Sequence, residues 1–447
     1  MPLSDFLRQS KRLTGTKVVC AEGDCGSCTV LRATPKPQGA LNYQAINSCI
    51  APLYTLDGAS LVTVEGLAHP EGPSPIQASF AQNHGAQCGF CTPGFVTSLT
   101  AMFEKTQNAT PKTIKNHLTG NLCRCTGYLD IIEAAQKVET EKIIPLRQRY
   151  NHPDMLKNLA EIRGQDAELK WDNLTFYAPT SLKSALNCKH NHNPRVIAGA
   201  TDLGVQINKT QTKLQKVMSL ALVDELQHIQ NHTDHISIGS TVNLHEAEEA
   251  LEQDIPELSR IIRVFASPQI KNTATLIGNI VNASPIGDTI PALLALGASL
   301  EIQSLNNQRT ENLADFYTGY RQTTLKPDEI VIGVKIPKPQ KAKFRTYKVC
   351  KRKDLDISGV CGGFYVMHDK DTITSARLAY GGVAATPVRL KKVEQQLVGK
   401  PFNQQTFDDA AQLVKQCISP LSDHRGSSDY RMTLSQNLLK KFFQECQ

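Results

Sequence analysis

Long apolar runs are the clearest absence in this sequence. The N-terminal residues MPLSDFLRQSKRLTG contain no apolar stretch long enough for a signal peptide. No window approaches the roughly 18 consecutive apolar residues that a membrane span needs. We therefore expect a soluble, cytoplasmic protein without a membrane partner.

Cysteine is too sparse for a disulfide scaffold, with 13 cysteines in 447 residues. Eight of the 13 nevertheless lie within the first 125 residues. Thiols stay reduced in the cytoplasm, so clustered cysteines there are typically metal ligands rather than disulfides. Their placement indicates a local chemical role.

A segregated excess of one charge is also missing. The formal net charge is +7, but acidic and basic residues are interspersed, and the densest basic stretch is only residues 348–353, KVCKRK. We therefore expect no nucleic-acid partner. The sequence also shows no Ser-His-acid arrangement, Walker loop or GxGxxG fingerprint.

The chain is long enough for several domains, and its residue pattern changes along its length. Strand-like runs such as CTVLRA come first, then helical runs, then a polar stretch without a period, then alternating strand-like runs such as RVIAGATDLGVQI and helices, and finally strands followed by helices. The predicted fold class is multidomain α+β. The expected parts are a domain at 1–66, a four-helix domain at 67–145, a linker at 146–170, a domain at 171–342 and a C-terminal domain at 343–447.

The first cysteine group is Cys20, Cys25 and Cys28, followed by Cys49 after twenty further residues. Three cysteines in one loop with a distant fourth is the plant-type [2Fe-2S] spacing. Glycines inside the loop would let backbone N–H groups point at the sulfurs. A four-cysteine zinc site is the alternative, although zinc usually takes two CxxC-like pairs.

The second group consists of the motif Cys88-Gly-Phe-Cys91 and the motif Cys123-Arg-Cys125, with a helical hairpin between them. Taken alone, CxxC with CxC could hold zinc as well as iron. Next to a first iron–sulfur set, a second [2Fe-2S] cluster becomes the better interpretation. Two clusters in series would form a path for single electrons.

The motifs CAEGDCGSCTV, QCGFCTPG and LCRCTGY, in this order, resemble the iron–sulfur half of the molybdenum hydroxylases, the family of xanthine dehydrogenase and aldehyde oxidase. The resemblance implies a β-grasp ferredoxin domain followed by a four-helix domain whose cluster lies near the molybdopterin of a partner, with Gln87 facing the pterin. Family members usually begin with a β-hairpin that precedes the helix matched here by the first residues. The β-grasp sheet is therefore expected to lack that hairpin.

Two glycine-containing segments follow downstream, and each is a weak signal alone. Residues 197–204 follow the strand-like run RVI, and such a turn can present successive N–H groups to a pyrophosphate, although ordinary tight turns look the same. The second segment runs over residues 275–288. Together they resemble the FAD domain of the same family, a fold shared with vanillyl-alcohol oxidase.

The resemblance implies a role for each matching residue. The FAD diphosphate would be cradled by Ile197, Ala198, Gly199, Ala200, Thr201, Asp202, Leu203 and Gly204. Thr275, Gly278 and Asn279 would line a second wall, and Asp288 would contact the ribose and phosphate region. Ile277 stands where the family usually has a glycine.

Phe265 and Lys391 are the expected catalytic residues. By resemblance, Phe265 covers the isoalloxazine where nicotinamide docks, and Lys391 lies near the flavin ring, where a cation favours the reduced anionic flavin. The alternatives are Phe265 as core, Lys391 as a solvated surface charge and Asp288 as a helix N-cap. The C-terminal domain looks like the small domain that closes over the flavin.

The resemblance implies an electron-transfer subunit. No segment could bind molybdopterin, so a molybdopterin-binding large subunit is expected, in a heterotetramer of two small and two large subunits. Electrons from oxidation of hypoxanthine to xanthine and urate would pass through two [2Fe-2S] clusters to FAD and on to NAD+. Alternatives are an aldehyde or N-heterocycle hydroxylase, and a zinc-stapled interaction protein without redox activity.

Overall fold

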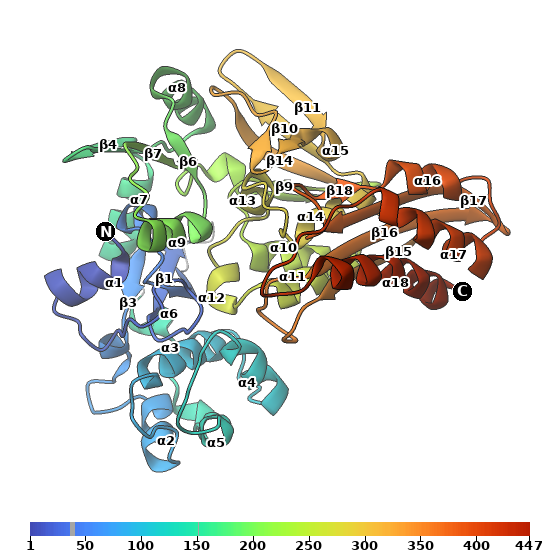
Figure 1. The fold of residues 1–447 in the computed structure, drawn as a ribbon. Coiled ribbons are helices and arrows are strands. Elements are labelled where there is room, and N and C mark those ends of the chain that lie inside the picture. The colour runs from blue at the N-terminus through green and yellow to red at the C-terminus, as the bar shows by residue number, and fades with distance from the viewer. Residues whose placement is uncertain (36–40, 151) are drawn as a thin grey trace. The chain divides into compact units, whose positions relative to one another are not determined.

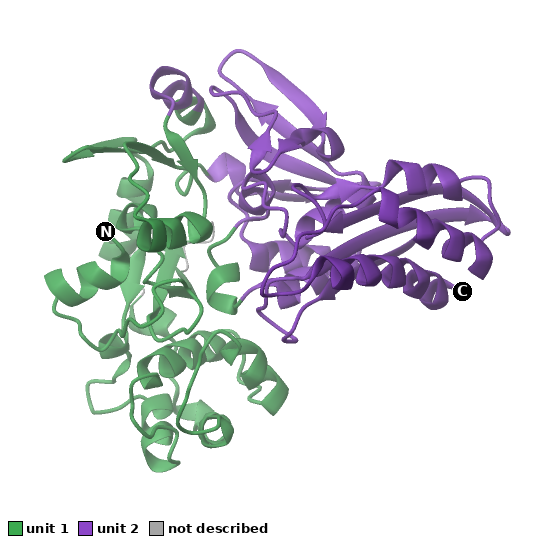
Figure 2. Ribbon diagram, in the orientation of Figure 1, with its two compact units in different colours: residues 1–185, 194–223, 267–274 green, residues 186–193, 224–266, 275–447 purple. Residues whose placement is uncertain are grey.

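The computed structural model describes residues 1–35, 41–150 and 152–447 (Figure 1). The chain divides into two compact units (Figure 2). Unit 1 comprises residues 1–185, 194–223 and 267–274, and unit 2 comprises residues 186–193, 224–266 and 275–447. Helices and mostly antiparallel strands occur in both units, so the predicted multidomain α+β class is confirmed.

Unit 1 begins with a small antiparallel sheet of strands β1 (Thr29–Pro35), β2 (Leu41–Asn47) and β3 (Ser60–Val62), in the order β2-β1-β3. Successive side chains of a strand point to opposite faces. Leu31 therefore packs with the neighbouring helical domain, whereas Val30 packs with Leu3 and Leu7 of α1 (Leu3–Asp5) and η1 (Phe6–Ser10).

The predicted four-helix domain follows. Its helices are α2 (Pro75–Gln82), α3 (Thr92–Phe103), α4 (Pro111–Leu118) and α5 (Leu129–Gln136). Helix α2 starts with a capping box between Ser74 and Gln77, and α4 starts where Thr110 Oγ1 accepts from the Thr113 N–H. Proline in the first turn of α2, α3 and α4 costs no hydrogen bond there.

The segment predicted as a linker is folded, and this expectation was wrong. Apart from residue 151, which lies outside the described residues, it forms α6 (Leu146–Arg149), α7 (Pro153–Arg163) and β4 (Ala167–Trp171). Leu159 of α7 is buried in the core of the four-helix domain. Tyr150 Oη donates to the Gly66 carbonyl at 2.6 Å. The sequence of α7 shows no clear apolar period because Leu159 is the buried residue of this helix.

A second sheet of unit 1 has the order β4-β5-β7-β6, with β5 (Leu174–Ala178), β6 (Arg195–Ile197) and β7 (Lys216–Ser219). Strands β6 and β7 pair in parallel, and helix α9 (Thr201–Thr210) connects them. The run RVIAGATDLGVQI, read as a β run, is a strand only as far as Ile197. Ala200 adopts a left-handed conformation with φ of 56°, which ends the extended backbone and opens α9. Helix α8 (Leu182–His192) precedes β6, and α12 (Pro268–Lys271) also contributes to unit 1.

Unit 2 contains an antiparallel sheet with the order β11-β10-β14-β9-β8. Alternate residues such as Ile236, Ile238, Leu300 and Ile302 are buried, as period-two patterning predicts. The strands are β8 (Ile229–Asn231), β9 (His235–Gly239), β10 (Ser299–Gln303), β11 (Gln308–Asn312) and β14 (Ile330–Pro337). The helices of this region are α10 (Leu244–Leu251), α11 (Pro256–Phe265), α13 (Leu276–Val281), α14 (Thr289–Leu296) and α15 (Leu313–Phe316), and a small hairpin pairs β12 (Tyr317–Gly319) with β13 (Gln322–Thr323).

The C-terminal part of unit 2 confirms the predicted strands followed by helices. Its sheet runs in the order β15-β16-β17-β18. The strands are β15 (Lys343–Val349), β16 (Val360–Asp369), β17 (Thr372–Gly381) and β18 (Val388–Arg389). The helices α16 (Lys391–Leu397), α17 (Gln404–Leu413) and α18 (Ser428–Cys446) share a core with this sheet, in which Phe364 packs edge-on against Phe442.

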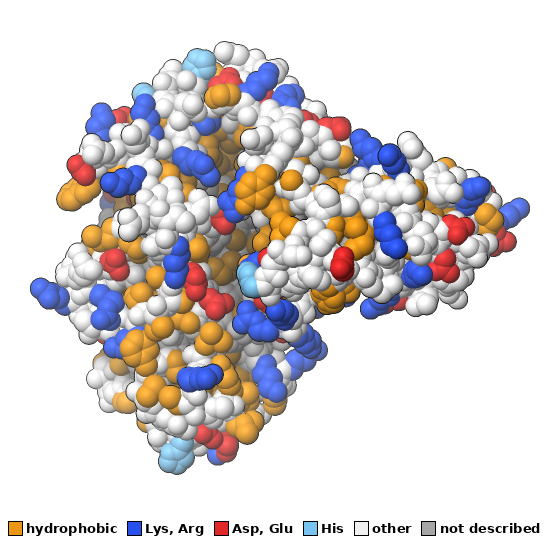
Figure 3. All heavy atoms as spheres, viewed as in Figure 1, with side chains coloured by type: hydrophobic (Ala, Val, Ile, Leu, Met, Phe, Trp, Pro, Cys, Tyr) orange, Lys and Arg blue, Asp and Glu red, His pale blue; other side chains and the backbone are white. Residues whose placement is uncertain are grey.

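The described residues show two further properties. None of their helices combines the length and apolar character that crossing a bilayer requires. Acidic and basic side chains are interspersed over the face shown in Figure 3, as the sequence indicated.

Candidate functional site

The first four cysteines meet because of the register of the first sheet. Strands β1 and β2 pair Thr29 with Asn47, so the loop before β1 and the turn after β2 lie side by side. Cys28 directly precedes Thr29, and Cys49 follows Asn47 after the one residue Ser48. The thiol of Cys49 contacts the thiols of Cys20 and Cys28, and the thiol of Cys20 also contacts that of Cys25. The structure thus brings the whole predicted set together.

These thiol contacts shift the pKa values of the four cysteines in opposite directions. Contact with Cys25 lowers the pKa of Cys20, and the same contact raises the pKa of Cys25. Contact with Cys49 lowers the pKa of Cys28 in the same way. Thiolate is the form of cysteine that binds metal, and binding of a cation displaces the proton shared by two sulfurs to solvent. The donor set therefore suits a thiophilic centre.

The loop that carries these cysteines requires glycine. Gly23 and Gly26 have φ of 79° and 68°, the left-handed region that side chains rarely adopt. A Cβ on Gly26 would lie 2.2 Å from the carbonyl oxygen of Gly120. Asn47 Nδ2 donates to the Gly23 carbonyl at 2.8 Å and holds the loop against β2.

Helix α9 lies directly against the same loop. Asn208 Nδ2 donates to the carbonyls of Ala21 at 3.0 Å and Cys49 at 2.8 Å, and Lys209 Nζ donates to the Cys20 carbonyl at 2.8 Å. A Cβ on Gly204 would lie 2.0 Å from the Ile50 carbonyl oxygen. One end of α9 therefore packs on the first cysteine set, while its N-terminal end carries the turn at 198–200.

The second cysteine set is gathered by the helical domain. Cys88 and Cys91 precede α3, and Cys123 and Cys125 lie between α4 and α5. The thiol of Cys88 contacts that of Cys125, and the thiol of Cys91 contacts that of Cys123. Burial, with the Cys123 contact, raises the pKa of Cys91 to about 12. Each contact joins one cysteine of CxxC to one of CxC.

This second set lies at the protein surface. Cys88 and Cys125 are exposed, and apolar side chains surround them in the sequence, with Phe90 at 46%, Leu122 at 43% and Leu129 at 77% exposure. A Cβ on Gly89 or on Gly127 would meet open space. Exposed apolar groups of this size beside exposed thiols are typical of an interaction surface.

The thiols of the second set lie as two pairs, Cys88 with Cys125 and Cys91 with Cys123. Tetrahedral zinc takes four ligands around one ion, and a two-iron cluster is held by four thiolates spread over two irons. The second set has the number of thiols that either kind of site takes.

The residues predicted to cradle a phosphate lie in unit 1, in the turn after β6 and the first turn of α9. The buried Ile197 ends β6, Ala198 and Gly199 form the turn, and Ala200 precedes the first residue of α9. A Cβ on Gly199 would lie 2.0 Å from the Thr273 carbonyl oxygen, so only glycine fits. The unsatisfied N–H groups of a helix N-terminus attract anions. The other predicted residues, Thr201, Asp202, Leu203 and Gly204, form the first turn of this helix.

The second predicted wall belongs to unit 2. Thr275 caps α13, where its Oγ1 accepts from the Gly278 N–H at 2.9 Å. Asn279 Oδ1 accepts from Thr289 Oγ1 at 2.6 Å. Gly278 is exposed. Ile277, the residue in place of a glycine, is only 4% exposed, so its side chain is in the core and leaves the exposed backbone at Gly278 uncovered.

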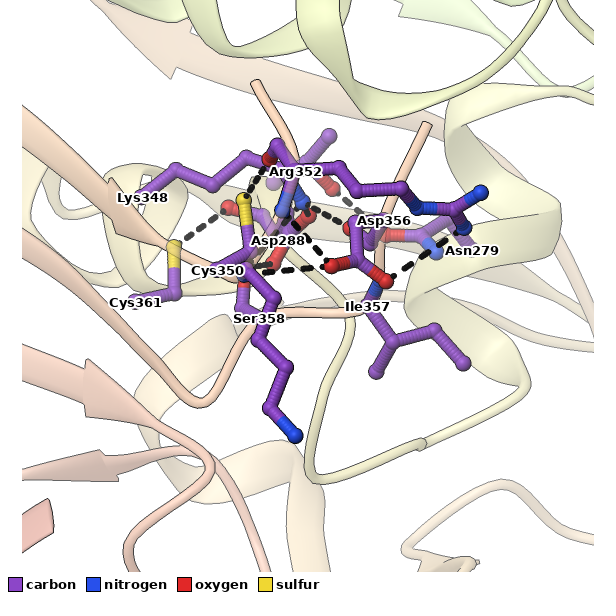
Figure 4. Close-up of polar contacts among 11 residues, drawn as sticks. Asn279, Asp288, Lys348, Cys350, Arg352, Asp356, Ile357, Ser358 and Cys361 are labelled. Carbon is purple, nitrogen blue, oxygen red and sulfur yellow. Dashed lines mark hydrogen bonds and ion pairs between the residues drawn. The ribbon is translucent and has the colours of Figure 1, made fainter. Parts of the chain in front are cut away.

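Asp288 is an internal ion-pair residue (Figure 4). It is 3% exposed, and its carboxylate pairs with Lys348 Nζ and accepts from Ser358 Oγ at 2.6 Å. It occupies the N-cap position of α14, but its side chain makes no capping hydrogen bond, so the N-cap alternative was wrong for the carboxylate. A buried carboxylate with an ammonium partner avoids the cost of an unpaired charge.

Lys348 is the residue that sequence reasoning missed. It was read only as part of a basic stretch, whereas its side chain is 4% exposed and also donates to the Asp356 carbonyl at 2.6 Å. Its position in a strand with buried neighbours was the available signal. Lys391 is exposed at the start of α16, and Phe265 is half-buried at the end of α11.

Three family models match the chain. Residues 63–136 match a [2Fe-2S] binding domain, residues 171–339 match the FAD binding domain in molybdopterin dehydrogenase, and residues 345–446 match the CO dehydrogenase flavoprotein C-terminal domain.

Curated relatives align along nearly the whole chain. Xanthine dehydrogenase of Oryza sativa subsp. japonica is 32% identical over 96% of this chain and 37% of its own length. Xanthine dehydrogenase of Emericella nidulans is 30% identical over 97% of this chain and 36% of its own length. The chain therefore spans little more than a third of these relatives.

Solved structures share the fold of part of the chain. A Cu,Mo-CO dehydrogenase in its cyanide-inactivated form has a TM-score of 0.56 and 24% identity, covering 61% of this chain and 97% of that one. Quinoline 2-oxidoreductase from Pseudomonas putida 86 has a TM-score of 0.57 and 24% identity, covering 62% of this chain and 98% of that one. At this identity the likeness establishes fold alone.

Proposed function

Since this chain is the iron–sulfur and FAD part of a molybdenum hydroxylase, we propose that it is the electron-transfer subunit of a xanthine dehydrogenase. The observation that carries the proposal is the content of unit 1. Two four-cysteine sets and a glycine turn at a helix N-terminus lie in one compact unit, with α9 packed on the first set. Such a unit can hold single-electron carriers beside a dinucleotide.

Eight cysteines would hold two [2Fe-2S] clusters. Cys20, Cys25, Cys28 and Cys49 would bind one, and Cys88, Cys91, Cys123 and Cys125 the other. The domain limits that go with this assignment are 1–66 and 67–145 for the cluster domains and 171–342 and 343–447 for the flavin domains. An iron–sulfur cluster exchanges one electron and FAD two, so a chain with both can join single-electron transfer to hydride chemistry.

The residues of the glycine turn fit an FAD diphosphate. Gly199 lets the turn pack against the Thr273 carbonyl, where a side chain would clash, and α9 supplies N–H donors at its first turn. Thr275, Gly278 and Asn279 would form the second wall. Phe265 and Lys391 are proposed to act at the isoalloxazine with NAD+ as co-substrate. The side chains of Asp288 and Lys348 are both buried. Asp288 would therefore act on the ribose and phosphate region of FAD through its ion pair with Lys348.

A molybdopterin-binding large subunit is the proposed partner. The exposed thiols and apolar residues of the second cysteine set offer a surface for it, and the exposed Gln87 would face the pterin. The curated relatives are much longer than this chain, which supports a further molybdenum-binding part. We propose two copies of each subunit, in the cytoplasm.

The alternative substrate classes are aldehydes and N-heterocycles. A protein of similar fold is a quinoline 2-oxidoreductase, which keeps the second class under consideration. The deciding experiment is purification of the tagged chain with its partner, followed by NAD+-dependent oxidation of xanthine, an aldehyde and quinoline in parallel. Preferential xanthine turnover supports the proposal, and preferential turnover of either other substrate replaces it.

A spectrum of the purified chain tests the cofactors themselves. Visible absorption from iron–sulfur and flavin that bleaches with dithionite is expected, together with iron and FAD in stoichiometric amounts. A colourless protein that contains zinc would show instead that the cysteines are structural staples.

A further inference from the structure

The two cysteine sets are joined by a direct backbone contact. The Leu122 N–H donates to the Cys25 carbonyl oxygen at 3.0 Å. Cys25 belongs to the first set, and Leu122 immediately precedes Cys123 of the second. The backbones of the two sets are therefore joined through a single hydrogen bond, one residue before Cys123 and at Cys25 itself.

A buried amide network surrounds this contact. Asn121 Nδ2 donates to the Gly26 carbonyl at 3.2 Å, and Asn121 Oδ1 accepts from Ser98 Oγ at 2.8 Å and from Gln269 Nε2 at 2.9 Å. Asn121 is 2% exposed and Gln269 1% exposed. Gly26 directly follows Cys25, and Asn121 directly precedes Leu122, so the two residues flank the hydrogen bond between Leu122 and Cys25.

The orientation of both amides is fixed by chemistry. A carbonyl oxygen can only accept, so the NH₂ group of Asn121 must face Gly26. Its oxygen then faces Gln269, which must present its own NH₂ group. Gln269 Nε2 also lies 3.1 Å from Ser98 Oγ and 3.4 Å from Thr29 Oγ1. Both amide orientations are thus fixed, whereas the buried Gln269 Oε1 makes no hydrogen bond with the described residues.

The packing at the junction leaves no room for adjustment. A Cβ on Gly26 or on Gly94 would lie 2.2 Å from the carbonyl oxygen of Gly120 or of Gly26, respectively. A Cβ on Gly120 would lie 2.2 Å from Gln269 Oε1. Three glycines are thus required where the first cysteine loop, α3 and the turn after α4 meet.

Gln269 comes from a segment far along the chain. Residues 267–274 belong to unit 1, although the residues on both sides of them belong to unit 2. Asn272 Nδ2 donates to the Ala45 carbonyl at 2.9 Å, and Arg32 Nη2 donates to the Asn272 carbonyl at 2.8 Å. The segment is anchored on β1 and β2 as well as on the helical domain.

We propose that Asn121 and Gln269 are positioning residues that set the electronic coupling between the two cysteine sets through the Leu122 to Cys25 hydrogen bond. This inference rests on the proposed function. One electron leaves the centre held by the second set and arrives at the centre held by the first, and no covalent bond breaks. Neither amide touches a cysteine sulfur in the described contacts; both act by holding the two backbones together.

Three variants of the full chain, purified with its partner, test the inference. Gln269→Met keeps the side-chain length but removes the donor. Asn121→Asp keeps the acceptor but places a carboxylate oxygen against the Gly26 carbonyl. Ser98→Ala removes one donor to Asn121. Ser79→Ala is the matched control, because Ser79 Oγ donates to the Ala134 carbonyl at 2.7 Å inside the same helical domain, in a contact between α2 and α5.

The readouts do not depend on turnover. In the dithionite-reduced protein, electron paramagnetic resonance should show spin–spin splitting between two clusters, and the first two variants should reduce it while both cluster signals keep full intensity. Hydrogen exchange of the Leu122 amide should become faster. Electron exchange between the sites should become slower in both variants, and the control should match the wild type.

The outcomes separate the two proposals. A wild-type protein without two iron–sulfur signals would refute the proposed function and this inference with it. Two normal clusters whose splitting and Leu122 exchange are unchanged in both Gln269→Met and Asn121→Asp would refute only the inference. If Asn121→Asp fails to fold, Gln269→Met decides, because it introduces no charge.

Discussion

Cys25 shows how much of this protein's chemistry depends on single side chains. Its thiol meets Cys20, and its carbonyl meets the N–H beside Cys123, so one residue belongs to both the metal-binding set and the contact between sets. Asp288 is another such residue, since its charge is balanced inside unit 2 by one lysine.

Replacing Cys25 with serine should remove one cluster. Serine is a poor ligand for iron, so the spectrum should lose one of the two cluster signals, and electrons from the partner should no longer reach FAD. NADH should still reduce FAD. Rapid-mixing absorption checks both, with Cys417→Ser as control because Cys417 lies outside both sets. Loss of FAD reduction by NADH would contradict the placement of this cluster between the partner and the flavin.

Breaking the Asp288 to Lys348 pair should destabilise the protein. Lys348→Met leaves a buried carboxylate without its cation and should cost about 3–5 kcal/mol of unfolding free energy. The double variant Asp288→Asn with Lys348→Met should recover much of that loss, because no unpaired charge remains. Denaturant unfolding measures all three proteins. Glu133→Gln, in an exposed pair with Lys137, is the control and should change little. Equal losses in the single and double variants would refute the coupling.

At the scale of elements, α9 connects two sites. Its N-terminal turn is the proposed diphosphate cradle, and Asn208, two turns along, holds the first cysteine loop. The α4 helix carries the half-buried His117, three residues before Gly120 of the junction between the cluster domains, which makes this helix sensitive to pH.

Adding a methyl group to the cradle should impair FAD binding. In Gly199→Ala the Cβ would lie 2.0 Å from the Thr273 carbonyl, so the turn must shift, with an overpacking cost of about 1–3 kcal/mol. FAD content after purification should fall while iron content stays constant. Gly164→Ala is the matched control, since its Cβ would meet atoms only at 3.4 Å and beyond. Normal FAD content in Gly199→Ala would argue against this turn as the cradle.

His117 should make unit 1 sensitive to mild acid. Burial lowers the pKa of His117, and its Nδ1 lies 2.9 Å from the Thr113 carbonyl. The unfolded chain therefore takes up a proton near pH 6.5 before the folded chain does, so stability is complete above that pH and falls as pH drops toward the folded pKa. Melting temperatures between pH 7.5 and 5.5 should fall less steeply in His117→Gln. Identical pH slopes in both proteins would contradict this.

At the scale of the whole molecule, the second cysteine set is the surface proposed to contact the partner subunit. Its outer thiols are exposed, and Leu129 beside them is 77% exposed. Burial of such a surface is what a separate molybdenum subunit would provide.

A charge at this surface should weaken binding of the large subunit. Burying one leucine contributes about 1.5–3 kcal/mol, so Leu129→Glu should raise Kd by roughly tenfold or more. Both cluster spectra should remain. Trp171→Glu, at a residue 82% exposed on β4, is the control and should still bring down the partner. Co-purification on an affinity tag measures this, and unchanged recovery with Leu129→Glu would place the docking surface elsewhere.

Local patterns in the sequence determined the elements and the ligand types. Cysteine spacing indicated two four-thiol sets, and the order of strand-like and helical runs indicated a multidomain α+β chain with a helical domain after the first strands. These signals depend on residues a few positions apart, so they survive without any knowledge of packing.

Only the tertiary structure decided which groups meet. It pairs Cys88 with Cys125 and Cys91 with Cys123, joins Asp288 to Lys348, packs α7 on the helical core and inserts residues 267–274 into unit 1. Each of these contacts joins residues that are distant in the chain, and their partners are selected by burial and hydrogen bonding across the whole fold. A polar segment without a period carries no local sign of that selection.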